Sequence, residues 1–388
     1  MNGFSTSPGD LALDRFPHDS RDPLRAWDAA DAYLLRRLAG LPGPEGEPVA
    51  AADLGGRVVV LGDRWGALTT ALAAFRPTLV TDSYLTAEAT RRNLAANGAD
   101  PDQVRITTTQ DAPPERVDVL LVRVPKSLAL LEDQLHRLAP SLHEGSLVVG
   151  TGMTTEIHTS TLDLFTRLVG PTRTTLAERK ARLILATPDA ALARPANPWP
   201  LTYALPSDIG VMAGRPVVNH AGVFCPDRLD IGTRFLLEHL PTPPANGHVV
   251  DLGCGNGVVG TAAALTTPGV RVTFVDESYP AVASAEATFR ANTPDAKAEF
   301  VVADGLSGAA PASVDLVLNN PPFHTHRATT DTVAWRMFRD SRAALRPGGE
   351  LWVIGNRHLG YHVKLKRLFG NCEVAASNPK FVVLRAVR

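Results

Sequence analysis

The second half of the chain alternates short apolar runs with longer stretches rich in small and charged residues. The apolar runs have the length and β-branched content of buried strands, and they cover residues 249–252, 270–275, 300–302 and 314–319. The stretches between them, such as 280–292 and 332–345, are expected to be helices. Strands that alternate with helices predict a doubly wound α/β fold with a mostly parallel sheet.

Three further apolar runs complete this half, at 351–355, 372–377 and 381–387. Only a turn containing Asn378 and Pro379 separates the last two runs. That turn is too short for a crossover helix, so the last two strands should be antiparallel.

The first half repeats this order in a degraded form. VVVLGDRWGA from Val58 to Ala67 aligns with VVDLGCGNGV from Val249 to Val258, and VTDSY at 80–84 aligns with VDESY at 275–279. VDVLLVRVPK from Val117 to Lys126 aligns with VDLVLNNPPF from Val314 to Phe323. We therefore expect two tandem domains of one fold, at 1–190 and 216–388, with a proline-rich linker at 191–215.

A glycine-rich turn in the second half is the first candidate binding element. DLGCGNG follows an apolar strand and precedes a small-residue helix, so its backbone can approach a ligand closely. The next strand ends in Asp276, where a carboxylate can accept hydrogen bonds from both hydroxyls of a ribose. The pair indicates a nucleotide-like ligand.

The sequence NNPPFH from Asn319 to His324 is the second candidate element. Each proline fixes its own φ and offers no N–H, so this rigidity serves something other than sheet pairing. The Asn320 side chain and the Pro321 carbonyl make two acceptors, and Phe323 supplies a flat apolar wall. This arrangement suits a planar amine. His324 and His326 could suggest a metal, but without a third candidate ligand nearby a loop contact is the simpler interpretation.

The first half lacks this chemistry. Gly255 is replaced by Arg64, Asn256 by Trp65, Asn320 by Arg123 and Phe323 by Lys126. Large side chains in the turn would fill the space that a ligand needs. Asp82 alone would suggest a second cofactor site, but we expect one cofactor per chain, with Arg123 and Lys126 suited to phosphate.

Composition and charge narrow the function further. A chain of 388 residues with net charge −1 is not one that grips nucleic acid with its whole surface. The segment from Pro321 to Arg388, however, holds 12 Lys and Arg against 4 Asp and Glu, a net +8 that leaves −9 for the rest. That segment is either a phosphate-facing surface or a solvated face of ordinary helices.

Localisation and metal content are also expectations from sequence. The first 19 residues have no basic segment followed by an apolar one, and no run of about 18 apolar residues occurs, so we expect a cytoplasmic protein. Three separated cysteines without a CxxC pair predict neither disulfides nor a cysteine zinc site, and we expect no metal.

With these motifs assembled, the chain resembles the RsmC/RlmG family of bacterial ribosomal RNA (guanine-N2-)-methyltransferases, class I enzymes that use S-adenosylmethionine. The specific pieces are GVFCPDRLDIG at 222–232, DLGCGNG, VDES at 275–278, NNPPFH and NRHLGYHVKLKRLFG at 356–370. The last piece, with SNPKFVVLRAV at 377–387, is closer to the large-subunit (23S) enzyme RlmG than to its small-subunit relative. Cys225 stands where a serine is expected, a departure without an interpretation. The family also carries a degenerate first methyltransferase domain.

The resemblance implies a role for each site residue. Asp251, Gly253 and Gly255 would border the methionine part of the cofactor, Asp276 the ribose and Asp304 the adenine amine. Asn320 would lie beside the cofactor and, with the carbonyl of Pro321, would accept hydrogen bonds from the guanine N2 amine, while Phe323 stacks on the base. Asp304 could instead be a turn residue before Gly305, and Phe323 a core residue. The basic segment supplies four candidate RNA contacts, Arg357, Lys364, Lys366 and Arg367.

The expected substrate is a guanine in ribosomal RNA, 23S rather than 16S, unpaired or flipped out of protein-free RNA. A monomer is expected. Three alternatives remain at this point: a protein glutamine methyltransferase, whose motif usually has Tyr where this chain has Phe323; a DNA amino-methyltransferase; and a non-catalytic RNA-binding assembly factor.

Overall fold

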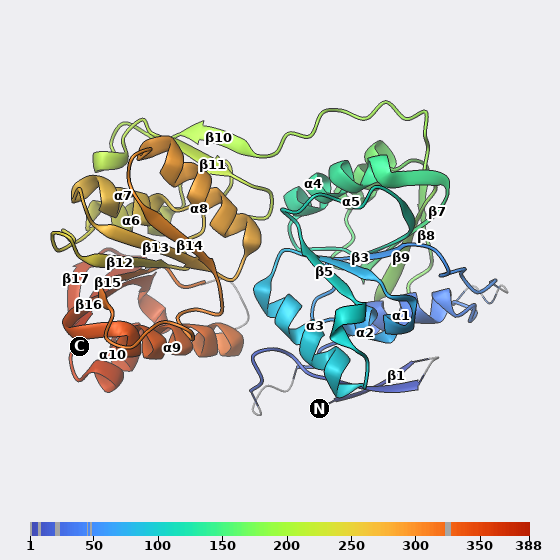
Figure 1. Ribbon diagram of the computed structural model, residues 1–388, viewed down its shortest axis with the longest axis horizontal. Helices are drawn as coiled ribbons and strands as arrows, with labels where there is room; N and C mark the ends of the chain where they lie inside the picture. Colours follow the sequence, from blue (N-terminus) through green and yellow to red (C-terminus); the bar gives the residue numbers. More distant parts are fainter. Residues whose placement is uncertain (1, 7–8, 20–23, 45, 47–48, 323–326) are drawn as a thin grey trace. The chain divides into compact units, whose positions relative to one another are not determined.

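The computed structural model describes residues 2–6, 9–19, 24–44, 46, 49–322 and 327–388. The chain divides into two compact units, Met1–Pro198 and Trp199–Arg388. Each unit contains a seven-stranded sheet (Figure 1).

The sheet of the second unit has the strand order β14-β13-β12-β15-β16-β18-β17. Its strands, in chain order, are β12 (His248–Leu252), β13 (Arg271–Asp276), β14 (Ala298–Val302), β15 (Val314–Asn319), β16 (Leu345–Asn356), β17 (Glu373–Ser377) and β18 (Phe381–Val387). The first five pair in parallel, whereas β18 is antiparallel to both β16 and β17. The antiparallel arrangement predicted for the last two strands is therefore confirmed.

Helices cover both faces of this sheet (Figure 1). One face carries α6 (Ile231–Glu238), α7 (Val258–Thr266) and α8 (Tyr279–Asn292), and the other carries α9 (Arg327–Ala344) and α10 (Tyr361–Phe369). Consecutive strand residues point to opposite faces, so Val249 packs with Phe274 and Phe289, while its neighbour Val250 packs with Phe338. Burial on both faces explains why the strands are apolar runs rather than alternating ones.

The first unit repeats the same topology, with strand order β5-β4-β3-β6-β7-β9-β8. Its sheet strands are β3 (Val58–Leu61), β4 (Thr78–Thr81), β5 (Arg105–Thr108), β6 (Val117–Arg123), β7 (Leu142–Met153), β8 (Thr172–Thr174) and β9 (Ala181–Ala186). One face is covered by α1 (Ala29–Leu38), α2 (Ala67–Ala71) and α3 (Tyr84–Ala96), the other by α4 (Leu128–Leu138) and α5 (Thr159–Leu168) (Figure 1). The predicted pair of doubly wound domains is confirmed.

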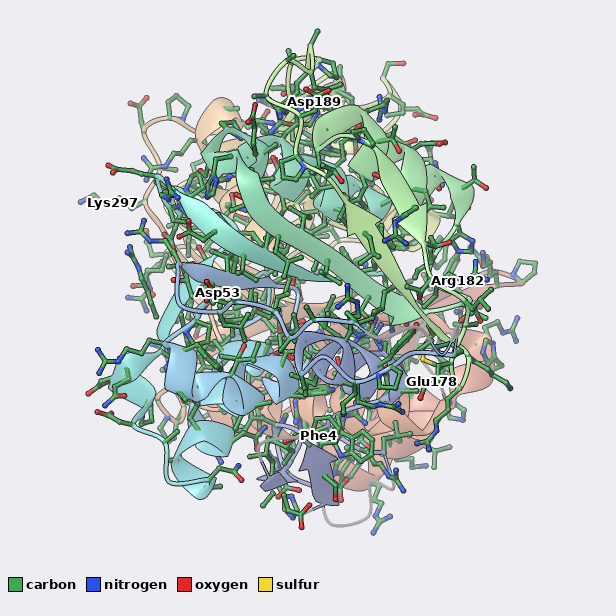
Figure 2. The ribbon with its side chains drawn as sticks, turned by 90° about the vertical axis from the view of Figure 1, so that its right-hand side faces the viewer. Phe4, Asp53, Glu178, Arg182, Asp189 and Lys297 are labelled. Atoms are coloured by element: carbon green, nitrogen blue, oxygen red, sulfur yellow. The ribbon has the colours of Figure 1, made fainter. Side chains whose placement is uncertain are left out.

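A β-hairpin precedes each sheet and was not predicted. The hairpins are β1 (Asn2–Thr6) with β2 (Gly9–Leu13), and β10 (Leu201–Ala204) with β11 (Pro216–Asn219). In the first, the ring of Phe4, labelled in Figure 2, stacks on Trp27 with a centroid separation of 4.3 Å. Strand β10 lies within the stretch 191–215 for which we expected a linker.

In each unit the second hairpin strand, or the residue just after it, bonds to the third helix. The Asp14 N–H donates to Asn93 Oδ1 on α3 over 2.9 Å, and the Val218 N–H donates to Thr288 Oγ1 on α8 over 3.0 Å. Polar side chains on the helix thus satisfy backbone groups that have no neighbouring strand. The internal repeat consequently extends beyond the sheets to the hairpins.

Candidate functional site

The predicted site residues of the second unit meet at one edge of its sheet. Gly253 follows β12, Asp276 ends β13, Asp304 comes soon after β14, and Asn320 follows β15. These four strands are parallel, so their carboxyl ends lie along the same edge. In open α/β sheets ligands bind in the crevice beyond this edge, where strand order reverses. Here that point lies between β12 and β15.

The turn after β12 needs glycine at two positions for steric reasons. Gly253 has φ of 72°, and a Cβ there would lie 3.3 Å from the backbone oxygen of Asn320. Gly257 has φ of 76°, and a Cβ there would lie 2.7 Å from the Cα of Ala285 on α8. Both positions combine the left-handed backbone region with a close neighbour. The turn therefore holds β12, β15 and α8 close together.

Asp276 fixes the same turn from the neighbouring strand. Its carboxylate accepts hydrogen bonds from the N–H groups of Gly255 over 3.1 Å and Ser278 over 3.0 Å. Burial raises the pKa of this carboxyl, and the two N–H groups lower it. A Cβ placed on Gly255 would meet nothing within 4 Å, so open space lies beside the turn at this point.

Asp251 of β12 bonds to the helix that follows the turn. Its side chain is buried, and its carboxylate accepts the Gly260 N–H at the start of α7 over 2.8 Å. Burial raises the pKa of Asp251 to about 8, and the nearby Asp276 carboxylate acts in the same direction. Asp251 thus ties β12 to the start of α7.

The side-chain amide of Asn320 is hydrogen-bonded through its nitrogen but not through its oxygen. Its Nδ2 donates to Thr233 Oγ1 on α6 over 3.0 Å. Its Oδ1 is buried and has no hydrogen-bond partner among the described residues. The adjacent Asn319 also has a buried Oδ1 without a partner among these residues, and its Nδ2 donates to the Leu252 backbone oxygen over 2.8 Å. The two differ in exposure, because the Asn319 side chain is fully buried within the sheet whereas Asn320 is half-buried at its edge. An uncommitted buried acceptor is costly unless a ligand satisfies it.

The rest of the NPPF motif is only partly described. Pro321 is buried and Pro322 is exposed. Phe323, His324 and His326 lie outside the described residues. Among the described residues, no group of three His, Cys, Asp or Glu side chains could hold a metal ion.

Asp304 forms an ion pair with α9, which covers the face of the sheet opposite to α6, α7 and α8. Arg336 of α9 donates to its carboxylate over 2.5 Å. Burial raises the pKa of Asp304, while Arg336 lowers it. The ion pair fixes the position of this carboxylate at the edge of the sheet.

The equivalent edge of the first unit is filled by ion pairs. Arg123, at the position of Asn320, is fully buried, and its guanidinium pairs with Asp28 at 2.7 Å, Glu156 at 2.8 Å and Asp31 at 3.3 Å. Arg64, at the position of Gly255, pairs with Glu156 over 2.5 Å. Our expectation that Arg123 contacts RNA phosphate is wrong, because three carboxylates already surround a side chain that solvent does not reach. Lys126, in contrast, is exposed.

The first unit also lacks the carboxylate at the end of its second strand. Thr81 ends β4, and its Oγ1 accepts the Ser83 N–H over 3.2 Å, as Asp276 accepts that of Ser278. Asp82 is therefore the counterpart of Glu277, one residue further along. A different carboxylate, Asp63 of the turn, accepts the Thr69 N–H at the start of α2 over 2.8 Å. Asp63 thus performs the bonding role of Asp251, but from the turn, at the position of Cys254 in the second unit.

Both units match models of known protein families. The family model described as RLMG N-terminal domain matches residues 1–190, and the one described as Methyltransferase small domain matches residues 214–385. The ribosomal RNA large subunit methyltransferase G of Streptomyces avermitilis is 69% identical over 389 residues and covers 100% of both chains. The chain belongs to the ribosomal RNA large subunit methyltransferase G family.

A more distant member agrees with this family assignment, and one solved structure shares the fold. The family member of Aeromonas salmonicida is 45% identical over 380 residues, with 97% of each chain covered. The T. thermophilus 16S rRNA N2 methyltransferase RsmC, solved in complex with AdoMet and guanosine, has a TM-score of 0.74 at 21% identity. The match covers 100% of this chain and 97% of that one, so the two share the fold throughout.

The basic residues near the C-terminus lie on and just before α10. Arg357, Lys366 and Arg367 are exposed, and Lys364 is half-buried with its Nζ 5.4 Å from the ring centroid of Tyr361. Leu365 and Tyr361 pack into the core, so one side of α10 presents charge to solvent. These four residues remain candidates for RNA contact.

Sequence reasoning missed Thr233, which binds Asn320 from 87 residues away. Asp230 caps α6 by accepting the Thr233 N–H over 2.9 Å. The pattern Asp-x-x-Thr before an apolar helical stretch is a signal for that cap. The cap could have been predicted from sequence, whereas the contact with Asn320 requires the fold.

Proposed function

We propose that this protein transfers a methyl group from S-adenosylmethionine to the exocyclic N2 amine of a guanine in large-subunit ribosomal RNA. The observation that carries the proposal is the buried, unpartnered Oδ1 of Asn320 beside the glycine turn of the second unit. Relatives at 69% and 45% identity that are named as large-subunit ribosomal RNA methyltransferases support the substrate class.

The edge of the second sheet fits the cofactor. The open space beside Gly255 and the backbone of the turn would receive its methionine part. Asp276 would accept hydrogen bonds from the ribose hydroxyls, and Asp304 would accept one from the adenine amine. When bound, the cofactor supplies an electrophilic methyl group on a sulfonium. The first unit would bind none, because Arg64, Arg123 and their carboxylates occupy the corresponding edge.

Asn320 and Pro321 would orient the acceptor amine. The lone pair of a guanine N2 amine is delocalised into the ring, so the amine is a poor nucleophile. Two acceptors that bind its hydrogens turn the lone pair toward the methyl group and hold the reactants in line. The nitrogen becomes acidic only as the new bond forms, so an amide that does not titrate near neutral pH is sufficient here.

The target base must leave any duplex to reach this edge. An amine stacked in a helix cannot approach a buried Oδ1, so the substrate would be an unpaired or flipped-out guanine. Phe323 would replace the lost stacking at about 1–3 kcal/mol. The charged side of α10 and Lys126 would contact phosphates. We also propose that the enzyme acts as a monomer on protein-free 23S RNA in the cytoplasm.

Methyl transfer from labelled cofactor tests the proposal. Deproteinised large-subunit RNA, deproteinised small-subunit RNA and a protein with an accessible glutamine would be offered in parallel to the full chain. Label in the large-subunit RNA alone is the expected result. Label in the protein would favour glutamine methylation, and label in none of them would favour a non-catalytic RNA-binding factor.

A further inference from the structure

Thr233 and Asp230 lie directly behind the proposed amine-binding group. Asp230 precedes α6 as its N-cap, and its Oδ2 accepts both the N–H of Thr233 over 2.9 Å and the hydroxyl of Thr233 over 3.3 Å. Thr233 Oγ1 in turn accepts Nδ2 of Asn320 over 3.0 Å. We infer that Thr233, held by Asp230, is a positioning residue that fixes which end of the Asn320 amide meets the substrate. This inference rests on the proposed function of Asn320.

The direction of these hydrogen bonds follows from the chemistry of the three groups. A carboxylate accepts hydrogen bonds and donates none, so the Thr233 hydroxyl must give its single proton to Asp230. The hydroxyl oxygen is then left only as an acceptor. The Asn320 amide can satisfy it only with its NH₂ end, which leaves Oδ1 on the other side without a partner among the described residues. The carboxylate at the start of α6 therefore sets the polarity of an amide at the end of β15.

The internal repeat provides an independent comparison. Asp28 is the N-cap of α1, as Asp230 is of α6, and Asp31 is the third residue of α1, as Thr233 is of α6. In the first unit these two side chains pair with Arg123, the counterpart of Asn320. The third residue of the helix thus contacts the equivalent position of the fourth strand or just after it in both units. Only the chemistry differs, because carboxylates hold a guanidinium in one and a hydroxyl holds an amide in the other.

A fixed amide has a consequence for specificity. With Nδ2 turned toward Thr233, the end of the Asn320 amide that is left for the substrate is Oδ1, an acceptor. An amine can use that acceptor, whereas a carbonyl oxygen in the same place would face Oδ1 without a hydrogen between them. Buried polar groups left unpaired in this way give strong discrimination against a wrong substrate. Thr233 would therefore help the site select an N–H-bearing group.

Two substitutions at one position test the inference. Thr233→Val replaces the hydroxyl with a methyl group but keeps the backbone N–H that Asp230 caps. We expect kcat with large-subunit RNA to fall by about 10-fold or more, the scale of one lost hydrogen bond at a reacting group. KM for RNA and cofactor affinity should change by no more than about threefold. Thr233→Ser restores the hydroxyl and should recover most of the rate, a rescue that a purely structural role of the residue does not require.

A double-mutant cycle separates this inference from the proposed function. In an Asn320→Ala background, Thr233→Val should change kcat by less than about twofold, because its effect passes through the amide. An equal 10-fold loss in that background would overturn the positioning role, as would a full-rate Thr233→Val enzyme alongside an impaired Asn320→Ala enzyme. A full-rate Asn320→Ala enzyme would instead contradict the proposed function itself. Thermal unfolding of each variant identifies any loss that comes from misfolding.

Discussion

Arg123 and Asn320 occupy equivalent positions in the two units. Each is the residue directly after the last pair that joins the fourth strand of its sheet (β6 or β15) to the first (β3 or β12). Val122 pairs with Leu61 in the first unit, and Asn319 pairs with Leu252 in the second. The backbone oxygen of each lies beside the glycine that follows the first strand. One side chain is enclosed by three carboxylates and the other keeps a free buried oxygen. The edge that is open beside Gly255 in the second unit is thus closed by an ion-pair network in the first.

The first prediction concerns that network. Arg123→Ala leaves the buried Asp31 carboxylate without its cation and leaves Glu156 with Arg64 alone, so it should lower the free energy of unfolding of the first unit by about 3–5 kcal/mol. Although burial alone would raise it, the pKa of Glu156 is lowered to about 2 by Arg123 and Arg64, so this carboxylate stays charged. Lys126→Ala is the control and should stay within about 0.5 kcal/mol, because Lys126 is exposed.

Calorimetric unfolding of the full chain measures both variants. An Arg123→Ala transition that coincides with that of the unsubstituted chain would show that the network adds no stability. If such a variant also bound RNA more weakly, Arg123 would be an RNA-contacting residue after all.

The second prediction concerns the number of cofactor sites. Asp276→Ala should weaken cofactor binding by about 1.5–3 kcal/mol through the lost charge-assisted hydrogen bonds to ribose. Asp82→Ala is the matched control from the first unit and should have no effect, because Thr81 and not Asp82 occupies the equivalent position. Isothermal titration of the full chain should give one cofactor per chain. A stoichiometry near two, or weaker binding in Asp82→Ala, would contradict the account.

The third prediction follows from the raised pKa of Asp251, which burial moves from 3.8 to about 8. The folded state then holds a proton that the unfolded state has released, so the stabilisation is complete below pH 3.8 and is lost as pH rises through about 8. Over that range one such group contributes a slope of about −1.4 kcal/mol per pH unit.

Asp251→Asn keeps an oxygen that can accept the Gly260 N–H but cannot titrate. Denaturant unfolding at several pH values should show a shallower fall in stability for this variant than for the unsubstituted chain. Identical pH profiles for the two proteins would mean that Asp251 does not carry the proton.

The fourth prediction concerns RNA binding. Lys366→Glu with Arg367→Glu should weaken RNA affinity and reduce the slope of its salt dependence by about one to two units. The control pair, Arg271→Glu with Lys297→Glu, reverses exposed charges at the start of β13 and just before β14 (Lys297 is labelled in Figure 2). In the strand order of the sheet, β13 and β14 lie at the other end from β18, on which α10 packs. Filter binding at several salt concentrations measures both pairs. If the Lys366→Glu and Arg367→Glu variant keeps the salt-dependence slope of the unsubstituted chain, the basic side of α10 faces solvent and does not contact RNA.

Much of the fold could be predicted from the sequence because its signals are local. Strands buried on both faces are apolar runs, and the two copies of the glycine turn align residue by residue. The same alignment placed Arg64 and Arg123 opposite Gly255 and Asn320. Side-chain size alone predicts that they exclude a ligand, and the structure adds which carboxylates they pair with.

The missing parts depend on contacts between distant residues. Arg123 meets Asp28 across 95 positions and Asn320 meets Thr233 across 87, and no local pattern specifies either pair. An arginine in the place of a binding residue suits phosphate as well as buried carboxylate, so charge alone favoured the wrong partner. The hairpins were missed because their strands are short and β2 and β11 bond to helices as well as to strands.

The central claim is that Asn320 directs methylation of a guanine N2 amine in large-subunit ribosomal RNA. Mass spectrometry of nucleosides from that RNA tests it most directly, in a strain that lacks the gene and carries either the unsubstituted chain or Asn320→Ala. The account predicts that one N2-methylguanosine is absent without the gene, returns with the unsubstituted chain and stays absent with Asn320→Ala, which should lower turnover by about 10²–10³-fold. Unchanged N2-methylguanosine in the strain without the gene, or its full return with Asn320→Ala, would contradict the account.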